Sequence, residues 1–305
     1  KLLLPTNSYR EIAEQFSRRL DQGLPGFPVE RSEEAIRKKI ARDGLTPEDL
    51  VSYAKENPVL DRLAMIQEIQ AQYEEESEDY DVGLPKNANI KILSLSDIHF
   101  PYARVDYLMD AVSKHADADI CVLNGDIFEG HVFSTYDKHK RVSALHEYQA
   151  AFQFLNICAE TFPNVYLVDG NHDVRSGKFL GRMGIENEAS QIFRPNLMAR
   201  MANGELLDET GMLVEQKDFS NVHYDQRESW YLRIGKTIFA HPHGRGGGKP
   251  GATVQTVANY FNSRYREGDI DCVVIGHTHK WYKGVHAQQL LIEQGCLSGL
   301  MTYAH

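Results

Sequence analysis

Aspartate, asparagine and histidine residues gather directly behind short apolar runs of this 305-residue chain, and these residue types can bind metals or transfer protons. The fragments are Ser96-Asp97-Ile98-His99, Asn124-Gly125-Asp126, Asp169-Gly170-Asn171-His172-Asp173, His241-Pro242-His243 and Gly276-His277-Thr278-His279. The runs before them have the length and the residue content of strands. Because α/β sheets place ligands at the carboxyl ends of their strands, we expect five strand ends to meet at one site.

Each fragment taken alone also has a structural explanation. Asp97 could form an Asx turn beside an unrelated histidine, and Asn171 or Asp173 could cap a helix. His277 and His279, two residues apart at a strand end, are seldom needed for folding. The combination of all five fragments in one chain favours a metal centre.

In this order, the motifs D-x-H, G-D, G-N-H-[DE], H and G-H-x-H resemble those of the calcineurin-like metallophosphoesterases, which include phosphatases, phosphodiesterases and nucleases. The resemblance extends from about Ile90 to the C-terminus and implies a four-layer α/β/β/α sandwich of two mixed sheets. One departure is Glu129 in G-D-x-x-E, where many members carry aspartate.

The resemblance also implies a ligand set for two metal ions. One ion is assigned to Asp97, His99, Asp126 and His279, and the other to Asp126, Asn171, His241 and His277. His243 is an alternative to His241, which the strand-end position favours. Mixed histidine, carboxylate and amide ligands suit Mn most, with Fe or Zn as alternatives, better than Ca or Mg. Two ions about 3.5 to 4 Å apart can clamp the attacking and leaving oxygens, and the expected nucleophile is a bridging hydroxide.

The resemblance gives His172 a different role, because the histidine of N-H-[DE] is not a ligand in this family. We expect His172 to protonate the leaving group, with Asp173 holding its tautomer; burial as a packing residue is the alternative. Weaker candidates, for contacts to the substrate, are Arg175, Arg245, Lys249 and Tyr102. A solvated face or a flexible glycine-rich connection explains the basic residues among them equally well.

The elements that must position these residues fall into two predicted domains. Residues 1–78 carry helix signals, residues 79–89 look like an acidic linker, and residues 90–305 alternate between strands and helices. The strands are expected at Ile90 to Leu95, Asp119 to Leu123, Val165 to Val168, Trp230 to Ala240, Asp271 to Ile275 and Leu290 to Ile292. The helices are expected at Val105 to Ala116, Ser143 to Thr161, Glu188 to Met201 and Ala252 to Arg266.

The N-terminal helices resemble a helix-turn-helix unit. Its second helix would expose Arg37, Lys38, Lys39 and Arg42 as a DNA-reading helix does. Against this, the spacer between the helices is long and contains two prolines, and the acidic and basic residues of positions 1–50 balance. A solvated face or a protein-binding module therefore remains the alternative to DNA binding.

Composition restricts the remaining possibilities. The net charge of −10 and pI near 5.7 exclude a protein that coats nucleic acid over its whole surface. Four widely spaced cysteines without a C-x-x-C motif indicate reduced thiols in a cytoplasmic protein, and no apolar run is long enough for a membrane span. We therefore expect a dimetal phosphodiesterase, with DNA as the candidate substrate. The alternatives are a phosphomonoesterase on a small molecule or phosphoprotein, and a nucleic-acid- or protein-binding regulator with structural metals.

Overall fold

The computed structural model describes residues 38, 80–85, 88–134, 142–182, 196–225, 229–244 and 248–299. The chain divides into two units, Lys1–Glu78 and Asp79–His305. Of the first unit only Lys38 is described, as a helical and exposed residue. The predicted helix-turn-helix, with Arg37, Lys39 and Arg42, otherwise lies outside the described residues.

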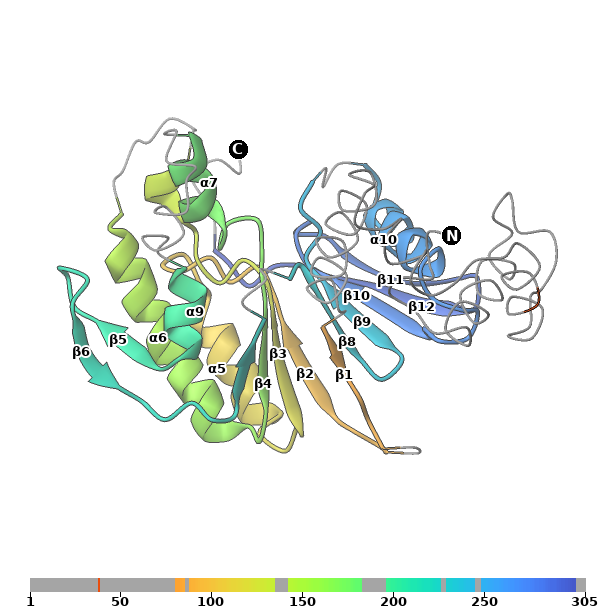
Figure 1. Ribbon diagram of the computed structural model, residues 1–305, viewed down its shortest axis with the longest axis horizontal. Coiled ribbons are helices and arrows are strands. Elements are labelled where there is room, and N and C mark those ends of the chain that lie inside the picture. Colours follow the sequence, from red (N-terminus) through yellow and green to blue (C-terminus); the bar gives the residue numbers. More distant parts are fainter. Residues whose placement is uncertain are drawn as a thin grey trace. The chain divides into compact units, whose positions relative to one another are not determined.

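A four-stranded parallel sheet forms one half of the second unit (Figure 1). It has the order β2 (Ile92–Leu95), β3 (Ile120–Asn124), β4 (Val165–Val168) and β7 (Val222–Tyr224). The β3 strand is buried throughout because both of its faces are covered. Cys121 and Leu123 pack toward helices, whereas Ile120 and Val122 pack toward a second sheet.

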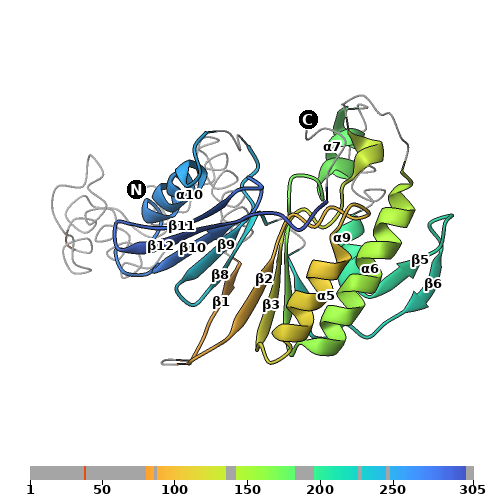
Figure 2. The ribbon, with the colours of Figure 1, turned by 180° about the vertical axis from the view of Figure 1, so that it is seen from behind.

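The second sheet has six strands and mixes parallel and antiparallel pairs. Its order is β1 (Asp81–Val82), β8 (Tyr231–Ile234), β9 (Thr237–Ala240), β10 (Cys272–Ile275), β12 (Gln289–Gln294) and β11 (Trp281–His286). Helix α10 (Ala252–Asn262) packs on the face turned away from the first sheet. Figure 2 shows the two sheets lying between α10 and the helices α5 and α6.

The helices of the other outer layer follow the predicted periodicity. Helices α5 (Val105–Lys114) and α6 (Ala144–Thr161) bury Leu108 and Val112 on the first and Phe152 and Leu155 on the second. The remaining elements of this side are η1 (His131–Phe133), α7 (Arg175–Arg182), α9 (Leu197–Ala202), β5 (Glu205–Leu207) and β6 (Leu213–Gln216). Only the end of the helix predicted at 188–201 is described, as α9. Among the described helices, none is long and apolar enough to cross a membrane.

The predicted α/β sandwich is confirmed, with three differences in detail. Only the six-stranded sheet is mixed, since every pair given for the other sheet is parallel. The single strand expected from Trp230 to Ala240 is the hairpin β8–β9, because Gly235 adopts a left-handed turn conformation. Strands β1, β5, β6, β7 and β11 were not predicted.

The segment 79–89, predicted to be a linker, contributes to the larger sheet. Strand β1 pairs with β8, and Asp81 accepts a 3.2 Å hydrogen bond from Arg233. Tyr80, Val82 and Leu84 pack against the core between the sheets. Their alternation with Asp81 and Gly83 is a strand pattern with one buried face, which the acidic residues before it in the sequence concealed.

Candidate metal centre

Five strand ends bring the predicted ligands together. Strands β2, β3 and β4 are parallel neighbours in one sheet, and β9 and β10 are parallel neighbours in the other. Their carboxyl ends therefore lie at matching edges of the two sheets. A hydrogen-bonding contact joins these edges, because His241 Nδ1, after β9, lies 2.9 Å from the carbonyl oxygen of Asn124, at the end of β3.

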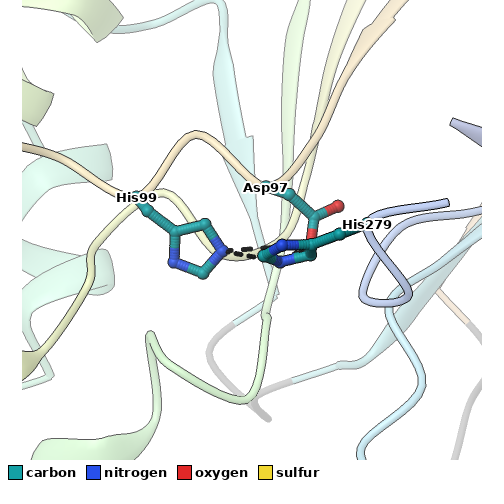
Figure 3. A group of neighbouring side chains, drawn as sticks. All are labelled: Asp97, His99 and His279. Atoms are coloured by element: carbon teal, nitrogen blue, oxygen red, sulfur yellow. Dashed lines mark hydrogen bonds and ion pairs between the residues drawn. The ribbon is translucent and has the colours of Figure 1, made fainter. Parts of the chain in front are cut away.

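Asp97, His99 and His279 form what we call the first cluster (Figure 3). His279 Nε2 lies 3.1 Å from Asp97 Oδ1 and 3.2 Å from His99 Nε2. Asp97 and His99 are fully buried, whereas the His279 side chain is about one-third exposed. Figure 3 shows the two rings and the carboxylate turned toward one another. The cluster is therefore buried on one side and open on the other.

Asp126, His241 and His277 form the second cluster. His241 Nε2 lies 3.1 Å from Asp126 Oδ2, and both side chains are buried. His277 Nε2 lies 2.8 Å from the carbonyl oxygen of Gly244. The His277 amide donates 3.0 Å hydrogen bonds to both carboxylate oxygens of Asp97, which ties the second cluster to the first.

The Asp126 carboxylate lies between the two clusters. Its Oδ2 atom is 3.7 Å from His99 Nε2 and 3.9 Å from His172 Nε2, and its Oδ1 accepts a 2.8 Å hydrogen bond from the His172 amide. Burial disfavours the carboxylate anion, but His241 and His172 outweigh burial and hold the pKa of Asp126 well below its usual range. Asp126 in turn raises the pKa of His241 to about 9, against the effect of burial.

Five of the six residues in the two clusters have a strained backbone conformation. Asp97, His99, Asp126, His277 and His279 all have φ between 53° and 75°, the left-handed region that residues other than glycine seldom adopt. Strained conformations of this kind concentrate at functional sites, where the surroundings enforce them. Among the described residues, the other non-glycine residues with positive φ are Ala287 and Gln288, which form the turn between β11 and β12.

Glycines of the motifs permit close approach of the backbone to the clusters. A Cβ atom on Gly170 would collide with the Asp126 carboxylate and amide nitrogen. A Cβ atom on Gly276 would collide with Ser96 Oγ, which donates a 2.6 Å hydrogen bond to Asp97 Oδ2. These two glycines are therefore required for packing around the carboxylates.

Two buried polar atoms test whether a metal fits. Within the described part of the chain, Asn171 Oδ1 has no hydrogen-bond partner, and His241 Nε2 has only its 3.1 Å contact with Asp126 Oδ2. A buried polar atom without a partner is costly, so such atoms call for a ligand that the protein does not supply. Amide oxygen and imidazole nitrogen are both metal ligands, and a nearby carboxylate, Asp126, supplies negative charge. The donor set therefore fits divalent cations.

His172 lies beside the clusters, and Glu129 holds it. Its Nδ1 atom is 2.9 Å from the Glu129 carbonyl oxygen and 3.3 Å from Glu129 Oε2. The Glu129 carboxylate is also 3.0 Å from His99 Nδ1. Burial opposes ionisation of Glu129, but His172 and His99 lower its pKa to about 2. Burial likewise opposes charge on His172, and Asp126 and Glu129 outweigh it and raise the pKa of His172.

The prediction that Asp173 orients His172 is wrong. The Asp173 carboxylate accepts hydrogen bonds of 2.8 to 3.0 Å from the backbone amides of Asp126, Phe128 and Gly170. It therefore fixes the loops that follow β3 and β4. Burial and the adjacent Asp126 raise the pKa of Asp173 to about 6. Sequence proximity suggested the His172–Asp173 pair, whereas consecutive side chains in this turn point in different directions.

Of the four weaker candidates for contacts to the substrate, Arg175 lies next to His172. Arg175 donates a 2.7 Å hydrogen bond to the Glu129 carbonyl oxygen and lies 2.8 Å from His172 Nε2. Lys249 is exposed, Tyr102 is half-buried, and Arg245 lies outside the described residues. None of these three is placed by a contact with the clusters among those described.

His241 and His243 lie in different places, and two further residues contact the clusters. His243 Nε2 lies 3.1 Å from the Asp169 carbonyl oxygen, away from the clusters, whereas His241 is beside Asp126. Ser96 was given no role, and Glu129 was expected only to lie behind the ligands, although they contact Asp97, His99 and His172. Their positions within or next to the D-x-H and G-D-x-x-E motifs were the signal that could have identified them.

Comparison with known proteins gives the same assignment. The profile of the calcineurin-like phosphoesterase family matches residues 90–281. A search of curated proteins finds no match to the chain. Asp126 belongs to two candidate metal-binding groups, one with His241 and His277 and one with His99 and His172, and the latter shares His99 with the first cluster. Adjoining sites of this kind are typical of hydrolases that use two metal ions. The chain belongs to the calcineurin-like phosphoesterase family, whose activity is metal-dependent hydrolysis of phosphoric esters.

Several solved structures are similar to the chain. A novel archaeal phosphodiesterase is 16% identical, with 70% of this chain and 88% of that chain covered and a TM-score of 0.37. Yfce, a phosphoesterase from E. coli, is 15% identical, with 71% and 84% covered and a TM-score of 0.34. Vps29 from Entamoeba histolytica complexed with Zn²⁺ is 13% identical, with 68% and 75% covered and a TM-score of 0.33. At these identities the likeness concerns the fold alone.

Proposed function

We propose that the chain is a phosphodiesterase that uses two metal ions, with DNA as the candidate substrate. The observation that carries the proposal is the position of the Asp126 carboxylate between the first and second clusters. Two carboxylate oxygens allow Asp126 to serve both clusters at once. The family supplies the reaction class, and the cleavage of a diester rather than a monoester is our proposal.

The first ion would be held by the first cluster and Asp126, and the second by the second cluster and Asn171. Mn²⁺ is the proposed metal, with Fe or Zn as alternatives, because the donors mix imidazole, carboxylate and amide. Such ions would polarise the phosphoryl oxygens and lower the pKa of water. Ser96, Glu129 and the carbonyl oxygen of Asn124 hold the ligands in position.

His172 supports this proposal as the proton donor to the leaving oxygen. Because Glu129 holds its Nδ1 atom, Nε2 is the atom that can transfer a proton. Asp126 and Glu129 favour the protonated ring by raising its pKa. Arg175 Nη2 lies 2.8 Å from the same Nε2 atom and can only donate, so the guanidinium would have to turn from Nε2 to the ester oxygen when Nε2 carries the proton. Asp173 contributes by fixing the loops rather than by contacting the substrate.

The remaining parts of the chain complete the proposal. We propose residues 1–78 as a separate helical domain that delivers DNA, and residues 90–305 as the phosphoesterase domain, in a cytoplasmic protein. The basic residues Arg37, Lys38, Lys39 and Arg42 would contact the DNA backbone. Arg245, Lys249 and Tyr102 remain proposed substrate contacts.

Hydrolysis by the Mn²⁺-loaded full chain tests the proposed function. A bis-aryl phosphodiester, a mono-aryl phosphate and end-labelled DNA would be compared, and the diester and DNA should be cleaved faster than the monoester. Turnover of the monoester alone would instead identify a phosphomonoesterase. Without turnover of any ester, a regulator with structural metals would replace the enzyme.

A further inference from the structure

Strand β11 leaves the metal centre directly from the first cluster. His279 is followed by Lys280 and then by Trp281, the first residue of β11. Two residues of extended chain span about 7 Å. Strand β11 is also the edge strand of the six-stranded sheet, as Figure 2 shows. A molecule bound along β11 would therefore end at the metal centre.

The exposed side chains of β11 lie on the same face of the six-stranded sheet as the side chains that pack between the two sheets. Trp281 lies opposite Gln294 of β12, and Lys283 lies opposite Ile292, which packs in the core between the sheets. The Gln294 amide donates to Ser94 Oγ and accepts from Asn124, which are residues of the strands that lead to Asp97 and Asp126. Trp281 therefore faces the side of the sheet on which the metal centre is built.

Large apolar side chains on this face are exposed to solvent. Trp281 and Val285 are each 74% exposed, and alternation places them on the same face as Lys283. The other tryptophan, Trp230, is half-buried and packs against Tyr231 and Phe261. An exposed tryptophan beside a catalytic centre provides a flat surface on which an aromatic ring can stack.

The charge along β11 is opposite to that of the chain as a whole. Positions 277–292 contain no aspartate or glutamate, but they contain Lys280 and Lys283, whereas the whole chain has a net charge of −10. Lys283 is exposed on the face of Trp281, whereas Lys280 Nζ donates a 2.6 Å hydrogen bond to the carbonyl oxygen of Gly248, before α10, and so lies toward the other face. A flat aromatic side chain with a neighbouring cation is the combination that binds single-stranded nucleic acid.

We propose that β11 binds a single-stranded polynucleotide, with one base stacked on Trp281 and the backbone phosphates following Lys283 toward the metal centre. This proposal rests on the proposed phosphodiesterase function, and it names single-stranded polynucleotides as the class of substrate for the metal centre. The surface is distinct from the N-terminal basic residues. A protein partner would also cover an apolar strand, but it would not require a cationic edge or show a dependence on nucleobases.

Binding of two matched oligonucleotides tests the proposal directly. The Mn²⁺-loaded full chain would be titrated with a thymidine decamer whose phosphorothioate linkages resist hydrolysis, and with an abasic decamer that has the same linkages and the same charge. Fluorescence anisotropy gives both dissociation constants. We expect the decamer with bases to bind about tenfold more tightly, because stacking of one base contributes on that scale.

Variants separate stacking from charge. Trp281→Ala should bind both decamers equally, Trp281→Phe should recover part of the difference, and Lys283→Ala should weaken both decamers by a similar factor. Quenching of tryptophan fluorescence by the thymidine decamer should persist in Trp230→Phe and disappear in Trp281→Ala. Circular dichroism would check that each variant folds. We expect the Trp281 variants to fold because the replaced side chain is exposed.

Two results would overturn the proposal. They are equal affinity of the wild-type chain for both decamers, and unchanged affinity of Trp281→Ala for the thymidine decamer. Because binding requires no turnover, these outcomes are independent of the hydrolysis of the bis-aryl diester. Base-dependent binding without diester hydrolysis would reject the proposed phosphodiesterase function but support polynucleotide binding by β11. Diester hydrolysis without base-dependent binding would support the phosphodiesterase function but reject polynucleotide binding by β11.

Discussion

The first and second clusters contain the same residue types but are held in different ways. In the first cluster, His99 rests against the carboxylate of Glu129. In the second cluster, His241 and His277 rest against backbone carbonyl oxygens of Asn124 and Gly244. A carboxylate partner makes an imidazole more basic than a carbonyl partner does. We therefore expect the first cluster to hold its metal ion more tightly, and the following variants test that difference.

Asp126→Asn should have the largest effect, because it removes the carboxylate that lies between the clusters. Hydrolysis of the bis-aryl diester should fall below detection in both kcat and kcat/KM. Asp110→Asn is the matched control, since Asp110 forms only an exposed ion pair with Lys114 on α5. Full activity in Asp126→Asn would show that the clusters work independently of this residue.

His172→Ala should lower kcat by about 10² to 10⁴ without removing metal, because His172 is proposed to transfer a proton and not to bind an ion. Steady-state kinetics and metal analysis on one preparation would measure both quantities. His115→Ala, at an exposed position after α5, is the control. Unchanged turnover would remove His172 from the mechanism, and loss of metal would make it a ligand.

Glu129→Gln should reduce the metal affinity of the first cluster about 10- to 100-fold, the usual effect of losing a hydrogen-bonded partner of a ligand. Chelator titration should then release the two ions together rather than in two steps. Glu160→Gln on α6 is the control, because Glu160 is exposed and bonds only Asn156 among the contacts described. Two-step release that persists in Glu129→Gln would contradict the role given to the carboxylate.

The smallest expected effect is a pH dependence of the metal-free protein. Burial opposes charge on His241 and His279, but neighbouring Asp126 and Asp97 raise their pKa values to about 9 and about 10. Stabilisation by these folded-state shifts is fully present below pH 6.5 and is lost as pH rises through 9 to 10. The melting temperature after chelation should fall over that interval, while that of the Mn²⁺-loaded protein should not. A parallel decrease in both forms would show that the histidines are not responsible.

Much of the centre could be predicted because its ligands stand at the ends of apolar runs. The ends of β2, β3, β4, β9 and β10 all follow recognisable strand patterns, and their parallel pairing brings them together. The orientation of individual side chains could not be predicted. Left-handed backbone at Asp97 and Asp126 turns each carboxylate toward the clusters, and nothing in local residue preference indicates such a conformation.

The parts of the fold that were missed depend on tertiary contacts. Strand β1 looks like a linker because it is short and its one acidic residue, Asp81, is exposed, and only the packing of Val82 against the core between the sheets explains it. Strand β11 contains one glycine and one lysine and has no buried residue, so its sequence lacks the apolar content of a central strand. Its pairing with β12 forms it. Because β11 is exposed, its sequence lacks the apolar pattern that predicts a strand. The same exposure makes β11 a candidate binding surface.

Metal content per chain tests the central claim that two sites share Asp126. Mass spectrometric metal analysis would compare the Mn²⁺-loaded wild-type chain with the His279→Ala, His241→Ala and Asp126→Asn variants. We predict two equivalents for the wild-type chain, about one for each histidine variant, and close to none for Asp126→Asn. Two equivalents retained by Asp126→Asn would contradict a shared carboxylate.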